Sequence, residues 1–136
     1  MRKVIVNFSG GKDSTVAILE AMKRYPKEEI MLCWQDTGTE YLETQSHIEK
    51  IAGMLELPLV ILKPPEDFWS LSRRRGYFPT QQFRQCTLYL KQQLFRTWVR
   101  HNRDQLGDEI VVVSGIRADE SISRFGFDPW CLLPGL

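Results

Sequence analysis

The stretch Lys3 to Ser14, KVIVNFSGGKDS, decides the fold expected of this chain. Its first half, Lys3 to Phe8, is apolar and rich in β-branched residues, which is typical of a strand buried inside a sheet. The glycines that follow lead into Ser14 to Arg24, a segment that is apolar nearly all round and indicates a helix. A strand, a glycine turn and a helix in this order predict the beginning of an α/β domain.

The rest of the sequence continues this alternation. Further strands are predicted at Ile30 to Trp34, Leu57 to Leu62 and Glu109 to Val113, and crossover helices at Glu40 to Leu55 and about Leu88 to Leu106, the last ending at Gly107. We therefore expect an α/β fold with a doubly wound, Rossmann-like parallel sheet in the order 3-2-1-4. Ligands of such sheets bind at the carboxyl ends of the strands, where the direction of winding reverses.

The bulk properties narrow the classes of protein. A chain of 136 residues with 43% hydrophobic residues fits one domain, and its net charge of +1 gives no general attraction to nucleic acid, which we do not expect as a partner. Its cysteines, Cys33, Cys86 and Cys131, lack metal-binding spacing, so we expect no iron–sulfur cluster. The N-terminal apolar run is too short for a signal peptide or a membrane span, which favours a cytoplasmic location.

The segment SGGKDS has the features of a phosphate-binding loop. Glycines between a strand and a helix let backbone N–H groups approach an anion, serines add hydroxyl donors, and lysine adds a positive charge. The aspartate is a candidate helix cap or Mg²⁺ ligand. The alternative is a tight turn without a ligand, and the pattern matches neither common nucleotide-binding loop. The candidate residues are Ser9, Gly10, Gly11, Lys12, Asp13 and Ser14.

A second candidate, DTGTE, follows the second predicted strand. Asp36 stands where a carboxylate meets a ribose hydroxyl or a metal-bound phosphate, with Thr37 and Gly38 beside it, although all three also suit a plain turn. Thr37 and Glu40 form a good capping box for the next helix, which explains Glu40 without a functional role.

A third candidate is the pattern RxCTxxxK at the start of the third helix. Arg84, Thr87 and Lys91 would meet a helix N-terminus there and form a second anion site, whereas a lone lysine is more often a solvated charge. Cys86 beside them has either a depressed pKa or a packing role.

The fourth candidate follows the last predicted strand. Gly115 and Arg117 come directly after its end, and Arg117 could bind phosphate in bidentate fashion or pair with Glu120, with Arg124 further on. If the strand order is as predicted, this segment and SGGKDS flank one crevice. The irregular stretch Pro64 to Cys86, with a short helix near Asp67 to Ser72, is either an active-site loop or an ordinary connection.

In these four segments the chain resembles the phosphoadenosine phosphosulfate reductase family, which belongs to the adenine nucleotide alpha hydrolase-like superfamily and shares its PP-loop. The matching segments are Ser9 to Ser14, Asp36 to Thr44, Arg84 to Lys91 and Gly115 to Arg124. The resemblance implies that they bind an adenine nucleotide: phosphoadenosine phosphosulfate, adenylylsulfate or ATP.

Several activities follow from the resemblance. One is a reductase of sulfur metabolism that uses thioredoxin or glutaredoxin as reductant. Another is an ATP pyrophosphatase or adenylyl transferase, with Asp13 or Asp36 as Mg²⁺ ligand. A third is a non-catalytic nucleotide-binding module, acting as a homo-oligomer or with a partner subunit. Lys12, Cys86 and Arg117 are the candidate catalytic residues.

The C-terminal Glu-Cys-Gly-Leu-His segment of the family's reductases has no counterpart here. We therefore expect a C-terminally shortened domain over residues 1–136, without the reductase nucleophile. Cys131 lies near the C-terminus, but its neighbours Trp130 and Leu132 supply neither a base nor a cation, so we expect it to be structural.

Overall fold

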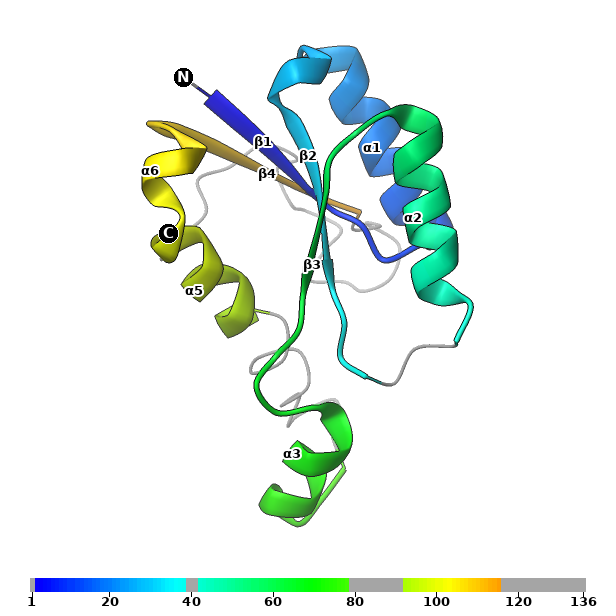
Figure 1. The fold of residues 1–136 in the computed structure, drawn as a ribbon, viewed down its shortest axis with the longest axis vertical. Coiled ribbons are helices and arrows are strands. Elements are labelled where there is room, and N and C mark those ends of the chain that lie inside the picture. The colour runs from blue at the N-terminus through cyan, green and yellow to red at the C-terminus, as the bar shows by residue number, and fades with distance from the viewer. Residues whose placement is uncertain (1, 39–41, 79–91, 116–136) are drawn as a thin grey trace, which may run out of the picture.

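The computed structural model describes residues 2–38, 42–78 and 92–115. Figure 1 shows their arrangement around one parallel sheet. The strands are β1 (Arg2–Asn7), β2 (Ile30–Gln35), β3 (Leu59–Leu62) and β4 (Glu109–Ser114), in the order β3-β2-β1-β4. The predicted α/β class and strand order are confirmed.

The register brings the ends of the strands to one edge. Val4 of β1 stands opposite Ile30 of β2 on one side and Val111 of β4 on the other, and the pairing runs on to Asn7 opposite Cys33 and Ser114. Because all strands are parallel, the segments that leave their carboxyl ends start from the same edge of the sheet. This places the loop after β1 between the segments that follow β2 and β4.

Helices cover both faces of the sheet (Figure 1). α1 (Lys12–Arg24) and α2 (Thr44–Leu55) lie on one face, and α5 (Gln93–His101) and α6 (Arg103–Leu106) lie on the other. A short 3-10 helix, η1 (Lys27–Glu29), precedes β2. α3 (Phe68–Arg75) follows β3 and stands apart from both layers (Figure 1). Within the described ranges, no helix is long and apolar enough to cross a membrane.

The pleat of the strands divides the core into two clusters. Val4, Val6 and Phe8 pack with α1 and α2, whereas Ile5 packs with Phe95 and Val99 of α5. Successive side chains of a strand point to opposite faces, so a strand buried on both faces is apolar throughout. This is why the central strands lack the alternation of polar and apolar residues.

Two predicted helices differ from those observed. α2 begins at Thr44 after Glu43, so Thr37 does not cap it, and the predicted capping box is wrong. Thr37 is buried instead, and its carbonyl accepts a hydrogen bond from the N–H of Phe68 at 3.1 Å. The third helix breaks at Asn102 into α5 and α6, because the Asn102 amide donates to the carbonyl of Trp98 at 2.8 Å.

Other details of the helices agree better with the sequence. The helix predicted near Asp67 to Ser72 is α3, and Gly107, with a φ of 92°, ends α6 as expected. α1 is less uniformly buried than its composition indicates, because Val16 and Leu19 are 57% and 47% exposed.

Candidate functional site

The loop between β1 and α1 is held by hydroxyl hydrogen bonds. The Ser14 hydroxyl accepts from the backbone N–H of Ser9 at 3.2 Å, donates to the carbonyl of Gly11 at 3.0 Å, and lies 3.2 Å from the Ser9 hydroxyl. Ser14 is 6% exposed, so its side chain ties the two ends of the loop together from inside. Its first role is therefore to shape the loop.

The helix α1 begins after a glycine. Gly11 is the N-cap residue, and it has no side chain that could accept from the first N–H groups of the helix. These groups have no partner within a helix, and together they form the positive end of its dipole. Lys12, the first helical residue, is exposed. The structure thus places a positive helix end and a lysine at the same turn, an arrangement suited to an anion.

Gly10 brings the loop close to α2. Its φ of 87° lies in the left-handed region, and a Cβ built on it would stand 3.3 Å from Ile48 and 3.5 Å from the His47 ring. A side chain at position 10 would therefore be strained in its backbone and crowded by α2. The exposed His47 thus lies beside the loop, which the sequence patterns did not indicate, because a single histidine on a predicted helix gives no signal.

Gly115 joins the last strand to this loop. A Cβ on Gly115 would stand 2.6 Å from the carbonyl carbon and oxygen of Asp13 and 2.8 Å from the nitrogen of Ser14. The residue after β4 thus packs directly on the first turn of α1, as the prediction of a shared crevice requires. Asp13 itself is half-buried at this contact.

The segment after β2 forms another wall at the same edge. The backbone N–H of Asp36 donates to the carbonyl of Leu62 at 2.8 Å, and one carboxylate oxygen of Asp36 accepts from the N–H of Gly38 at 3.0 Å. This local turn accounts for one oxygen of Asp36 and leaves the other available to a ligand. Gly38 packs against Asp67, which stands 3.2 Å from the position of its missing Cβ.

The remaining predicted residues lie outside the described ranges. They are Arg84, Cys86, Thr87, Lys91, Arg117 and Arg124. The site is thus described for the loop after β1, the turn after β2 and the first residue after β4. Within these ranges, His, Cys, Asp and Glu side chains form no group of three that could hold a metal ion.

The sequence patterns did not indicate a row of three hydrogen-bonded polar side chains that crosses the sheet. The Gln35 amide donates to the Asn7 side-chain oxygen at 3.1 Å, and the Asn7 amide donates to the Ser114 hydroxyl at 3.1 Å. These residues end β2, β1 and β4, and each stands two positions beyond an apolar residue that packs towards α5 and α6. The signal available in the sequence was that each of these three apolar strands ends in a polar residue. The three polar side chains line the carboxyl edge of the sheet on the side opposite α1.

Comparison with known proteins agrees with this arrangement. The family model described as phosphoadenosine phosphosulfate reductase domain matches residues 3–128. The chain belongs to this family. The match contains the loop after β1, the turn after β2 and the segment after β4.

Two curated relatives come from Methanocaldococcus jannaschii. The uncharacterized protein MJ0066 is 30% identical over 123 residues, which are 90% of this chain and 24% of that protein. The uncharacterized protein MJ0973 is 31% identical over 118 residues, or 87% of this chain and 26% of the relative. The chain therefore spans about a quarter of the length of these relatives, and their names assign no activity.

Proposed function

We propose that this chain binds an adenine nucleotide at the carboxyl edge of its sheet, with the phosphates held by the loop Ser9 to Ser14. The single observation that carries the proposal is the backbone contact between Gly115 and Asp13, which packs the residue after β4 onto the start of α1, where the N-cap residue is a glycine. Two segments far apart in the sequence meet at the turn where N–H groups and a lysine attract an anion.

The proposed ligand is phosphoadenosine phosphosulfate or adenylylsulfate, and the proposed setting is sulfur metabolism. Membership of the family supports this choice of nucleotide. Lys12 would neutralise phosphate charge, and the second oxygen of Asp36 would accept from a ribose hydroxyl. Arg84, Lys91 and Arg117 remain the proposed cations for the sulfate and the further phosphate.

ATP is the competing ligand, because Asp36 follows β2 at this edge and Asp13 lies in the first turn of α1. Mg²⁺ commonly binds through one or two carboxylates together with the phosphates of its nucleotide, and these two residues are the proposed carboxylates. Mg²⁺ would reduce the charge repulsion between phosphate and these side chains.

Mass spectrometry of the nucleotide retained by the purified chain tests the proposal. An adenylylsulfate-type nucleotide supports the sulfur assignment, ATP supports the competing ligand, and no bound nucleotide at saturating added ligand overturns both. Product assays then distinguish the three proposed functions. Sulfite released with reduced thioredoxin indicates a reductase, pyrophosphate released from ATP indicates adenylyl transfer, and tight binding without either product indicates a non-catalytic module.

A further inference from the structure

A pocket on α3 adjoins the turn after β2 but contains none of the proposed nucleotide-binding residues. It has a volume of about 560 Å³ and is lined by Asp67, Trp69, Ser72, Arg73, Gly76, Tyr77 and Phe78. Cavities of this size accommodate ligands as large as a nucleotide. The helix that carries it stands apart from the two helical layers of the domain (Figure 1).

Aromatic rings form the walls of this pocket. Trp69, Tyr77 and Phe78 are 51%, 41% and 64% exposed, and within the described ranges they account for all the aromatic rings among the exposed large hydrophobic residues. The Trp69 and Phe78 rings stand 6.4 Å apart at 88°, and Phe68 stacks on Phe78 at 6.5 Å. Rings fixed at a right angle offer a flat ligand one face to stack on and one edge to meet.

A buried hydroxyl lacks a partner in the same pocket. Ser72 is 7% exposed, and its Oγ has no hydrogen bond. A buried hydroxyl left without a partner costs about 1–3 kcal/mol, which is why nearly all such groups are satisfied in folded proteins. A ligand that exchanges a hydrogen bond with Ser72 would remove this cost.

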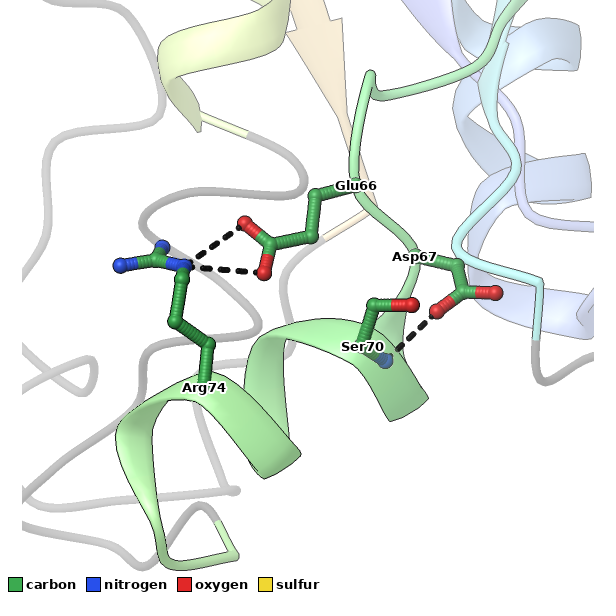
Figure 2. A network of polar contacts seen from close by, with 4 residues as sticks. All are labelled: Glu66, Asp67, Ser70 and Arg74. Atoms are coloured by element: carbon green, nitrogen blue, oxygen red, sulfur yellow. Dashed lines mark hydrogen bonds and ion pairs between the residues drawn. The ribbon is translucent and has the colours of Figure 1, made fainter.

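Charges stand at both ends of the pocket. Asp67 lies at the start of α3, where one of its oxygens accepts from the N–H of Ser70 at 2.7 Å (Figure 2). Arg73 lies in the last turn and is exposed, whereas the neighbouring Arg74 pairs with Glu66 at 2.9 Å (Figure 2). The Asp67 carboxylate is thus engaged by donors at the start of its own helix, and the pocket offers a ligand the exposed guanidinium of Arg73.

From this combination we infer that the pocket binds a nucleotide unit. The base would stack on Trp69 or Phe78, its edge would bond to Ser72, and its phosphate would meet Arg73. Stacking of bases on exposed aromatic rings beside arginine is the usual way in which proteins hold single-stranded nucleic acid. A net charge near zero does not reveal such a local cluster. A free nucleotide and a nucleotide within a single strand both offer the base and the phosphate that the pocket would bind.

The inference is independent of the proposed function, and the test keeps the two apart. A fluorescein-labelled thymidine 12-mer, which contains no adenine, is titrated with the protein and followed by fluorescence anisotropy. Trp69→Ala is expected to weaken binding at least about fivefold, because stacking on one ring contributes at least that much. Met54→Ala, which changes an exposed apolar side chain of α2, should leave binding unchanged. Equal binding by the wild-type chain and Trp69→Ala overturns the inference.

The Ser72→Ala variant distinguishes an effect on ligand binding from an effect on folding. Removing an unpartnered buried hydroxyl is neutral or stabilising for the fold, so the melting temperature should stay or rise while the 12-mer binds less tightly. A structural role alone would leave the binding unchanged. Arg73→Gln and Arg103→Gln each remove one positive charge, and Arg103→Gln is the control. Only Arg73→Gln should reduce the slope of the logarithm of the binding constant against the logarithm of the salt concentration, by about 0.7.

Two further results would identify the source of the ligand, and a third would overturn the inference. If thymidine monophosphate competes at millimolar concentration but the 12-mer binds no more tightly, the pocket holds a free nucleotide. If the 12-mer binds more tightly and a duplex of equal length does not, the pocket holds a single strand. If neither binds, and the chain self-associates in sedimentation through Trp69, the surface is a protein interface and the inference is wrong.

Discussion

Gly115 packs on the backbone of Asp13 so closely that a Cβ on Gly115 would stand 2.6 Å from the Asp13 carbonyl carbon and oxygen. This contact fixes the end of β4 against the first turn of α1. It places Gly115 beside the loop Ser9 to Ser14, where the phosphates are proposed to bind. The contact therefore links the stability of the fold to the shape of the site.

Gly115→Ala is expected to lower the free energy of unfolding by about 1–3 kcal/mol, because the added methyl group meets backbone that cannot turn aside. Nucleotide affinity should fall as well, since the loop must shift. Gly53→Ala is the matched control: no atom lies within 4 Å of its added methyl group, and alanine favours the interior of α2. Urea unfolding of both variants checks this, and equal stabilities would contradict the packing described.

Ser14→Ala removes the hydroxyl that joins Ser9 to Gly11. We expect a loss of about 0.5–1.5 kcal/mol in the free energy of unfolding, because the hydrogen bonds of the buried Ser14 hydroxyl to Ser9 and Gly11 are lost. Ser46→Ala, on the exposed side of α2, should change stability by less than about 0.5 kcal/mol. Thermal unfolding compares the two variants, and an unaffected Ser14→Ala would show that the loop does not depend on this hydroxyl.

Cys33 is expected to be unreactive in the folded protein. Burial raises the pKa of its thiol from 9.0 to about 12, so little thiolate forms at about pH 8. In a Cys86→Ser, Cys131→Ser variant, a thiol-specific disulfide reagent should react only after guanidinium unfolding. Between pH 9 and 12 the folded state holds the thiol proton that the unfolded chain releases, so this group makes stability fall as pH rises through that range. Rapid reaction of the native protein would disprove the burial.

Asp67 should lose its role at the start of α3 in acid. The hydrogen bond from the Ser70 N–H lowers the pKa of Asp67 below 3.8, so its contribution is present above that value and is lost as pH falls through the folded pKa. The Ser70 amide resonance should titrate with a midpoint below 3.8. Asp67→Asn, which caps a helix without titrating, should abolish this transition. A midpoint at or above 3.8 would contradict the hydrogen bond.

The sheet could be predicted because its strands are short apolar runs separated by helical patterns. Val4 to Val6, buried on both faces, leave little choice but a central parallel strand. The helix ends were less predictable. Thr37 and Glu40 satisfy a capping rule locally, but Thr37 is buried beside α3, and that tertiary position decides its role.

The residues of the candidate site were also only partly predictable from the sequence. The glycines and serines of SGGKDS were recognisable as a candidate phosphate loop because they stand between a strand and a helix. Gln35, Asn7 and Ser114 were not, because a single polar residue at the end of an apolar strand does not show which side-chain hydrogen bonds it makes. Ser72 was equally hidden, since only its burial reveals that its hydroxyl lacks a partner.

Calorimetric titration with phosphoadenosine phosphosulfate, adenylylsulfate and Mg-ATP tests the central claim most directly, with Lys12→Ala and Lys50→Ala beside the wild-type chain. Both lysines are exposed, so neither change should affect folding. The wild type and Lys50→Ala should bind one of these nucleotides equally well, whereas Lys12→Ala should bind it about ten- to a hundredfold more weakly, as expected for a lost charged hydrogen bond. Binding of none of the three, or equal binding by all three proteins, would contradict the claim that Ser9 to Ser14 holds the phosphates of an adenine nucleotide.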